Sequence, residues 1–270
     1  MDAPIGVFDS GVGGLTVVKE IMRQLPGENL VYFGDTARVP YGSKSKITVC
    51  KYSRQIVRFL QTKNVKAVVA ACNTASALAL DEIRDEIDIP VLGVVEPGAV
   101  MAAKTTRTKN IGIIGTESTI KSGIYNKFLH RIDPDITVVS KACPLFVPLV
   151  EEGLWEDRVT EDIVGRYLHE LKEYDIDALI LGCTHYPLLR RIIGQEMGEN
   201  VKLVNPAYET AKSLKTLLTE KDLLNTIGID EKEPSYDYFV SDGVEKFISF
   251  ADDVLSCHVE KAEIIDIESF

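Results

Sequence analysis

The feature of this sequence that most limits its fold is the alternation of short apolar runs with longer amphipathic segments. Most of the runs are apolar along their whole length, which is typical of strands buried on both faces of a sheet. Together they predict an α/β protein in which mostly parallel sheets are flanked by helices. The expected helical segments are 75–88, 118–130, 158–173 and 187–197, and the expected strands are 5–9, 30–34, 67–71, 91–95, 110–115, 136–140, 178–182, 201–205, 237–241 and 262–266.

The chain also repeats itself. One strand followed by a helix resembles any other, but three matches in the same order, offset by 106 to 111 residues, indicate a duplication. We therefore expect two pseudo-symmetric lobes, with residues 1–96 plus 207–270 in lobe one and residues 97–206 in lobe two. The matched pairs are IGVFDSGVGGLTVVK from Ile5 with IGIIGTESTIKSGIY from Ile111, AVVAACNTASALAL from Ala67 with ALILGCTHYPLLRR from Ala178, and VVEPGA (94–99) with LVNPAY (203–208).

Composition argues against several classes of function. The formal net charge of −11 disfavours nucleic-acid binding, since phosphate neutralisation by Lys and Arg dominates such affinity. No apolar run reaches the ~20 residues of a membrane-spanning helix, and no basic region precedes an apolar stretch at the N-terminus. We therefore expect a cytoplasmic protein that binds neither membranes nor nucleic acid. The five cysteines are scattered and the four histidines stand outside metal-ligand spacing, so we expect neither a disulfide framework nor a metal site.

Polar residues follow the ends of several predicted strands, where ligands bind in open α/β sheets. Asp9 and Ser10 end the first strand, and Asp35 follows the second. Residues 72–74 (Cys-Asn-Thr) and 183–185 (Cys-Thr-His) follow the third strand and its counterpart in the repeat. The glycines of DSGVGG match neither a dinucleotide-binding fingerprint nor a P-loop, so the spacing favours a tight strand-to-helix turn.

Two cysteines differ from the other three. A free cysteine is usually a small packing residue, and we interpret Cys50, Cys143 and Cys257 as core or surface residues. Cys72 and Cys183 both stand in the first turn after a strand. At a helix N-terminus the dipole favours the thiolate, so we expect lowered thiol pKa values at these two positions.

Two thiols that face each other across a cleft suit racemisation, which needs a base on one face of a carbon and an acid on the other. His185 could stabilise a thiolate at Cys183, and Asp9 could accept or relay a proton near Cys72. Uncharged hydrogen-bonding groups suited to the carboxylates of a small substrate stand at Ser10, Asn73, Thr74 and Thr184. Helix capping explains Ser10 and Thr74 equally well.

Six motifs occur along the chain in the order FDSGVGGLTV, YFGDTARVPYG, ACNTAS, VVEPGA, CPLFVPLVEEG and LGCTHYPLL. In these motifs the chain resembles the glutamate racemases, the cofactor-independent enzymes that supply D-glutamate for bacterial peptidoglycan. The resemblance runs from about residue 5 to about residue 210 and implies an active site between two α/β lobes, no cofactor, glutamate as substrate and a homodimer. Val39 stands where many members of the family have a cysteine, but the resemblance implies no catalytic or binding role for this position.

The resemblance also implies roles for individual residues. Cys72, assisted by Asp9, would handle the proton on the D-glutamate face. Cys183, assisted by His185, would handle the proton on the L-glutamate face, with Glu151 near this second thiol. The implied substrate-binding positions are Asp9, Ser10, Tyr41, Gly42, Asn73, Thr74, Thr184 and His185.

Three alternatives stay open at this point. The chain could be an aspartate racemase or a related two-cysteine isomerase. It could be a two-lobed binding protein that closes on an anionic metabolite without turning it over. It could also be a thiol redox protein in which Cys72 and Cys183 form a reversible disulfide.

Overall fold

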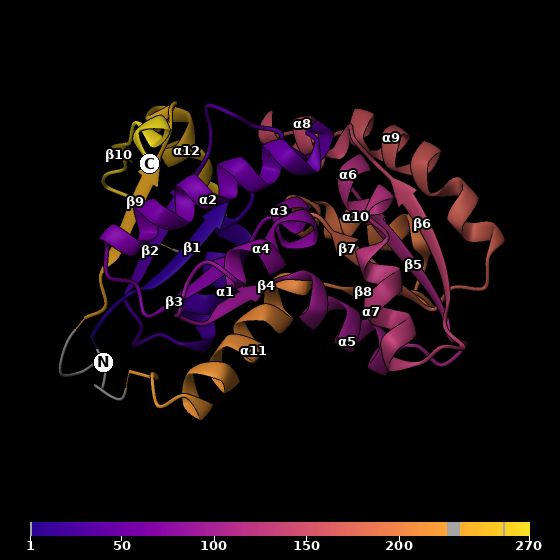
Figure 1. The fold of residues 1–270 in the computed structure, drawn as a ribbon. Coiled ribbons are helices and arrows are strands. Elements are labelled where there is room, and N and C mark those ends of the chain that lie inside the picture. Colours follow the sequence, from indigo (N-terminus) through magenta and orange to yellow (C-terminus); the bar gives the residue numbers. More distant parts are fainter. Residues whose placement is uncertain (1, 226–232, 256) are drawn as a thin grey trace.

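The computed structural model describes residues 2–225, 233–255 and 257–270, and its strands form two separate sheets (Figure 1). The first sheet has six strands in the order β10-β9-β2-β1-β3-β4, and the second has four in the order β6-β5-β7-β8. All recorded strand pairs are parallel. The strands are β1 (Ile5–Asp9), β2 (Leu30–Gly34), β3 (Ala67–Ala70), β4 (Val91–Gly93), β5 (Asn110–Gly115), β6 (Thr137–Ala142), β7 (Ala178–Gly182), β8 (Lys202–Val204), β9 (Tyr236–Val240) and β10 (Glu263–Ile264).

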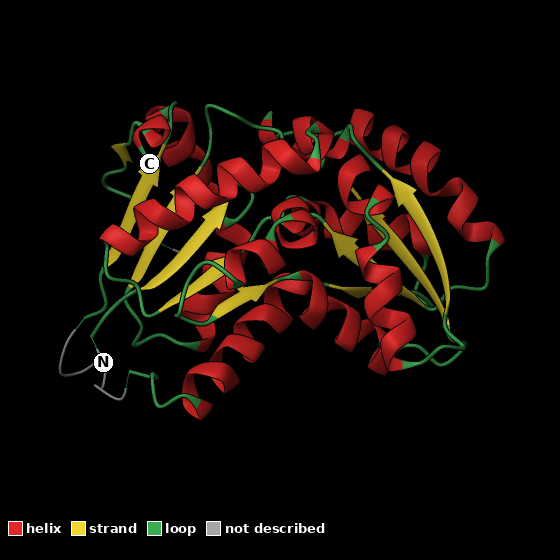
Figure 2. Ribbon diagram, in the orientation of Figure 1, coloured by secondary structure: helices red, strands yellow, loops and turns green. Residues whose placement is uncertain are grey.

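Helices cover the sheets, and Figure 2 shows the two groups of strands with helices around and between them. The predicted fold class, two lobes of parallel sheet flanked by helices, is confirmed. The α-helices are α1 (Leu15–Gln24), α2 (Lys46–Thr62), α3 (Asn73–Leu78), α4 (Leu80–Arg84), α5 (Val95–Thr105), α6 (Glu117–Lys121), α7 (Ile124–Ile132), α8 (Phe146–Glu151), α9 (Arg158–Leu168), α10 (Arg190–Met197), α11 (Pro206–Glu220) and α12 (Val244–Val254), with 3-10 turns η1 (Tyr41–Ser43), η2 (His169–Glu173), η3 (Tyr186–Leu189) and η4 (Ile267–Ser269).

The duplication is visible in the strand order. The run β2-β1-β3-β4 in the first sheet corresponds strand for strand to β6-β5-β7-β8 in the second. The register agrees as well, because Ile5 lies opposite Ala67 and Ile111 lies opposite Ala178. Each sheet therefore contains the same four-stranded unit, and equivalent residues of the repeat lie at equivalent strand ends.

The central strands are buried along their full length, as their uninterrupted apolar sequence requires. Every residue of β1, β3 and β7 is buried. Burying one large aliphatic side chain contributes about 1.5–3 kcal/mol, so these strands anchor the edges from which the site residues extend.

None of the four expected helices is continuous, and for two of them a single residue gives the local reason. Residues 118–130 fall into α6 and α7, separated by Gly123 at φ +63°, a left-handed conformation that glycine adopts without a steric penalty. Residues 187–197 begin as the 3-10 turn η3, where Pro187 offers no N–H, and become α-helical only from Arg190. The segment 75–88 is likewise divided into α3 and α4, and 158–173 ends in η2.

The C-terminal segment adds to the first sheet, since β9 pairs with β2 and β10 pairs with β9. Helix α11 packs against both α1 and α5 and lies below the sheets in the view of Figure 1. The lobe boundaries at residues 96 and 206 stay predictions. In the described part of the chain, no helix is both long and apolar enough to cross a bilayer.

Candidate active site

Both singled-out cysteines lie just beyond the carboxyl ends of interior strands. Cys72 is two residues past the end of β3, and Cys183 directly follows the last residue of β7. Asp9 is the last residue of β1, the strand next to β3. The duplication therefore gives each sheet one thiol just past an equivalent strand end. We call residues 72–74, after β3, the first corner and residues 183–185, after β7, the second corner.

At the second sheet, the thiol of Cys183 belongs to a hydrogen-bonded chain of three side chains. Cys183 Sγ lies 3.8 Å from His185 Nδ1, and His185 Nε2 lies 3.1 Å from Oε1 of Glu151, at the end of α8. Burial alone would lower the pKa of His185, but its hydrogen bonds to Cys183 and Glu151 outweigh burial and raise the pKa to about 10. Burial likewise opposes ionisation of Glu151, yet the hydrogen bond from His185 keeps its carboxyl pKa below the usual value. The chain thus places a charged imidazole between the sulfur of Cys183 and the carboxylate of Glu151.

At the first sheet, the thiol of Cys72 has a different environment. Its Sγ donates to Ser10 Oγ at 3.6 Å and accepts from the backbone N–H of Ala75 at 3.5 Å, so Cys72 is the N-cap of α3. Burial and the nearby Asp9 carboxylate raise the pKa of Cys72 to about 12. The expected lowering of this pKa by the helix is wrong, because α3 has only six residues and burial outweighs its dipole.

Asp9 is completely buried and links the two corners. Its Oδ2 accepts from the N–H of Gly11 at 3.0 Å, and Thr184 Oγ1 lies 3.4 Å from its Oδ1. Burial raises the pKa of Asp9, whereas the positive charge of His185 and the backbone N–H groups around it lower the same pKa. Asp9 therefore interacts electrostatically with both the thiol of Cys72, in its own sheet, and the imidazolium of His185, in the other sheet.

The glycine-rich turn packs directly against the second corner. A Cβ at Gly13 would lie 2.5 Å from the ring of His185 and from Thr184 Oγ1, so only glycine fits there. Thr16, one turn further on, donates from Oγ1 to the carbonyl of Thr184 at 2.9 Å. The predicted tight turn is present, and Gly13 is the glycine of the turn that permits the close approach of the two lobes.

Helix α3 makes the matching contacts to the second lobe. Tyr125 donates its hydroxyl to Asn73 Oδ1 at 2.7 Å, and Thr74 Oγ1 lies 3.0 Å from Thr116 Oγ1 and 3.2 Å from Thr119 Oγ1. Sequence reasoning did not identify Thr16, Tyr125, Thr116 or Thr119. Thr16, Tyr125 and Thr119 lie inside helices, whereas Thr116 directly follows β5, a position that could have singled it out.

Tyr41 and Gly42 lie in η1, on a loop that reaches the same region from β2. The hydroxyl of Tyr41 donates to Asp35, so a ligand would contact the backbone or the ring of Tyr41 and not its hydroxyl. A Cβ at Gly42 would lie 2.5 Å from Thr116 Cβ, which shows how closely the loop approaches the threonine cluster around Thr74.

The site residues are nearly inaccessible to solvent. Cys72 is 5% exposed, Cys183 6% and His185 2%. A small cavity of about 160 Å³ lies beside them and is lined in part by Gly11, Val39 and Glu151. A larger hollow of about 620 Å³ lies beside β9 and β10, away from both thiols. The structure is a closed arrangement, so a ligand reaches the thiols only after the lobes or the loop move.

Within residues 2–225, 233–255 and 257–270, no group of three or more His, Cys, Asp or Glu side chains lies close enough together to hold a metal ion.

Comparison with known proteins extends these observations. The Asp/Glu/Hydantoin racemase family matches residues 5–214 of the chain. A glutamate racemase of Geobacter metallireducens is 53% identical over 245 residues, which are 90% of this chain and 89% of the relative. The chain belongs to the glutamate racemase family.

Solved structures agree over nearly the whole length of the chain. Glutamate racemase RacE1 of Bacillus anthracis superposes with a TM-score of 0.93 at 42% identity, covering 98% of this chain and 97% of that one. A glutamate racemase of Francisella tularensis, solved with D-glutamate, superposes with a TM-score of 0.92 at 40% identity, covering 100% and 99%. The similarity to solved structures therefore continues past residue 214, where the match to the family model ends.

Proposed function

We propose that this chain interconverts L-glutamate and D-glutamate by moving the α-proton between two thiols, Cys72 and Cys183. The observation that carries the proposal is the placement of one thiol just past an equivalent strand end of each of two duplicated sheets, with Asp9 and His185 close enough to perturb each other's pKa. Membership of the glutamate racemase family supports glutamate as the substrate.

The groups beside the two thiols carry opposite charges, a carboxylate near Cys72 and an imidazolium near Cys183. Cys72 is buried beside a carboxylate and keeps its proton at neutral pH, because its pKa is raised to about 12. A thiolate at Cys183 is stabilised by the His185 imidazolium, which Glu151 holds in its charged form. This distribution fits the L-to-D direction: the Cys183 thiolate removes the α-proton of L-glutamate, and the Cys72 thiol delivers its own proton to the opposite face.

The transfer leaves Cys183 protonated and Cys72 as the thiolate, which is the starting state for the reverse direction. No bond other than S–H and Cα–H changes, so the step needs neither oxidant nor reductant. A Cys72 thiolate keeps the hydrogen bond from the N–H of Ala75. Between the two proton transfers, the substrate carries negative charge at its α-carbon. The predicted site side chains other than Glu151 are buried, and Gly42 packs against Thr116, so the closed site excludes water from this carbanionic intermediate.

The proposal is tested by incubating the purified protein with D-glutamate in deuterated buffer without added cofactor. Optical rotation and α-deuterium are followed together in wild type, Cys72→Ser and Cys183→Ser. Cys50→Ser is the control, because Cys50 is a buried cysteine whose Sγ bonds to the carbonyl of Leu78, outside the site.

We expect the wild type and Cys50→Ser to lose rotation while deuterium enters the α-position, and the other two variants to do neither. Turnover of aspartate with none of glutamate would assign the chain to the alternative isomerase. Binding without turnover in the wild type would favour the two-lobed binding protein. A reversible Cys72–Cys183 disulfide, detected by mass spectrometry, would favour the redox protein.

Three further properties belong to the same proposal. The resemblance to the family supports a homodimer, and exposed apolar side chains in lobe two, Leu145, Leu154 and Val159, are candidates for its interface, which light scattering would test. The need for two reduced thiols supports a cytoplasmic location. The resemblance also supports a role for the D-glutamate product in peptidoglycan synthesis.

A further inference from the structure

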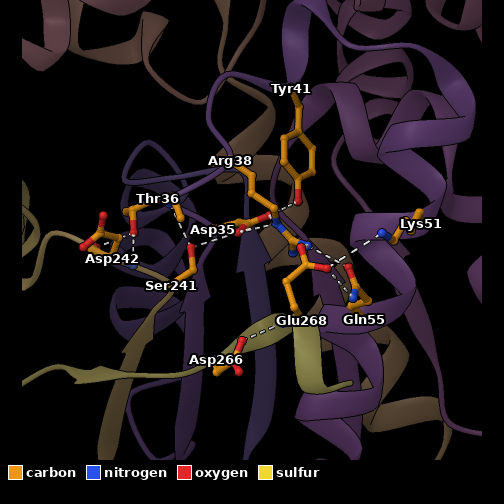
Figure 3. Close-up of polar contacts among 11 residues, drawn as sticks. Asp35, Thr36, Arg38, Tyr41, Lys51, Gln55, Ser241, Asp242, Asp266 and Glu268 are labelled. Atoms are coloured by element: carbon orange, nitrogen blue, oxygen red, sulfur yellow. Dashed lines mark hydrogen bonds and ion pairs between the residues drawn. The ribbon is translucent and has the colours of Figure 1, made fainter.

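A cluster of charged and polar side chains lies at the base of the loop that carries Tyr41 and Gly42. We call residues 36–44 the site loop. Figure 3 shows the cluster between β2, α2 and the C-terminal turn, with Arg38 at its centre. We call it the anchor cluster, and it consists of Asp35, Arg38, Tyr41, Gln55 and Glu268.

Asp35 connects two residues of the site loop, Arg38 and Tyr41, to the first sheet. It is completely buried, and its carboxylate accepts from Arg38 Nε at 2.7 Å, from Ser241 Oγ at 2.9 Å and from the hydroxyl of Tyr41. Burial and the Asp35 carboxylate raise the pKa of Tyr41 well above its usual value, so this hydroxyl remains a donor.

Arg38 connects Asp35 to the end of the chain. Its side chain is 10% exposed, and its guanidinium lies 4.0 Å above the ring of Tyr52. Nη1 donates to Gln55 Oε1 at 2.7 Å and to Glu268 Oε1 at 2.8 Å. The guanidinium therefore has a carboxylate on each side, one buried and one at the surface.

The other side of the site loop contacts the proposed active site. Val39 lies against the glycine turn, since a Cβ at Gly11 would be 3.2 Å from Val39 Cγ2. Gly42 packs on Thr116, the partner of Thr74, and the carbonyl of Lys44 accepts from Ser118 Oγ at 3.1 Å. A shift of Arg38 or Tyr41 is thus passed to the residues around Thr74 and Cys72.

Glu268 is supplied by the last turn of the chain, which packs on α2. The ring of Phe270 packs edge-on against the ring of Phe59, with 5.5 Å between the ring centroids. Arg58 Nη1 donates to the carbonyl of Phe270 at 3.2 Å. Lys51 lies 3.7 Å from the second carboxylate oxygen of Glu268. The contacts of Phe270 with α2 hold the Glu268 carboxylate in front of Arg38, which is 230 residues away in the sequence, whereas Lys51 is 63% exposed and lies beyond hydrogen-bond distance.

We propose that Glu268 is a positioning residue for the substrate: by holding Arg38, it fixes Tyr41 and Gly42 of the site loop, so that the C-terminal turn controls substrate affinity. The inference rests on the proposed function, in which the site loop contributes to the glutamate site. Glu268 touches neither thiol, so its loss should weaken substrate binding and leave the proton transfers intact.

The test compares Glu268→Gln with wild type. Glu268 is 57% exposed, so the substitution should leave the fold intact while it removes the charge that pairs with Arg38 and, more weakly, with Lys51. We expect KM for both enantiomers to rise about three- to fivefold, the effect of a partly exposed ion pair at the upper end of its range, with kcat nearly unchanged. Raising the salt concentration to about 0.5 M should raise KM of the wild type more than that of the variant, because it screens only an intact pair.

Hydrogen–deuterium exchange gives a readout that does not need activity. In the substrate-free protein, amides of residues 36–44 should exchange faster in Glu268→Gln than in wild type. Lys51→Met and Glu263→Gln are the matched controls: the first removes the other cation of Glu268, and the second removes an exposed C-terminal glutamate paired with Lys261. Both should behave as wild type.

The outcomes separate this inference from the proposed function. Unchanged KM and unchanged exchange in Glu268→Gln overturn it, as does an equal change in either control. If the wild type racemises no glutamate, the proposed function fails, but the exchange comparison still decides whether Glu268 orders the site loop. Faster exchange of residues 36–44 in Glu268→Gln alone would support that ordering.

Discussion

Replacing His185 by glutamine should change how the stability of the protein depends on pH. His185 is 2% exposed, and its hydrogen bonds to Cys183 and Glu151 raise its pKa from 6.5 to about 10. A pKa raised on folding means that the folded state binds the proton more tightly than the unfolded state. The resulting stabilisation is complete below pH 6.5 and is lost as the pH rises through 10.

The magnitude follows from the two pKa values. At about 1.4 kcal/mol per pH unit, the shift corresponds to an upper limit of roughly 5 kcal/mol. Between pH 7 and pH 9, the free energy of unfolding of the wild type should therefore fall by roughly 3 kcal/mol relative to that of His185→Gln. The Glu151 carboxylate left behind in the variant titrates at lower pH, so it does not alter the slope in this range.

Urea unfolding at half-unit pH steps from 6 to 9.5, at constant ionic strength, measures this difference. Taking wild type minus variant cancels the titration of tyrosines and of the other cysteines. Glu151→Gln should move the same loss of stability to lower pH, because it removes one of the groups that raise the pKa of His185. A difference between wild type and His185→Gln that stays constant from pH 6.5 to 9.5 would refute a charged imidazole at this position.

Other substitutions probe the packing that supports the site. Lys66→Met removes one member of a buried ion pair, Lys66 Nζ to Glu28 Oε2 at 2.5 Å, and should lower the free energy of unfolding by about 3–5 kcal/mol without changing kcat, as urea unfolding and kinetics would reveal. Gly13→Ala places a methyl group 2.5 Å from His185 and should lower kcat/KM about 100-fold, whereas Gly194→Ala, in α10 with its nearest neighbour at 3.6 Å, should leave activity unchanged and raise the melting temperature. Tyr125→Phe removes the hydroxyl that donates to Asn73 and should destabilise the protein by about 1–3 kcal/mol, measured by calorimetry; no loss would mean that Asn73 does not depend on this bond.

The strands were the most predictable part of the fold. β1, β2, β5 and β7 begin and end where their apolar runs do, because a strand buried on both faces has little choice of residues. The helices were less predictable, since their ends depend on single residues. Gly123, at φ +63°, separates α6 from α7. Because glycine is also tolerated inside helices, its presence in the sequence does not by itself predict this break.

The site was predictable where it follows strand ends and unpredictable where it depends on contacts between lobes. Cys72, Cys183 and Asp9 could be singled out because topology alone places strand ends at one edge of a sheet. Tyr125 and Thr119 could not, since nothing in a sequence pairs a tyrosine of α7 or a threonine of α6 with residues of α3. Glu268 could not be found for the same reason: its partner Arg38 lies at the other end of the chain.

The two cysteine corners lie at equivalent strand ends of the duplicated sheets, yet the side chains around them carry opposite charges, and the proposed reaction requires that difference. If a carboxylate stood beside both thiols, both would keep their protons at neutral pH and no base would be available. If an imidazolium stood beside both, both would be driven towards the thiolate and no acid would remain. With Asp9 near Cys72 and the His185–Glu151 pair near Cys183, one thiol holds a proton while the other can accept one. A duplicated framework thus supplies the two positions, and divergence of the neighbouring side chains supplies the acid and the base.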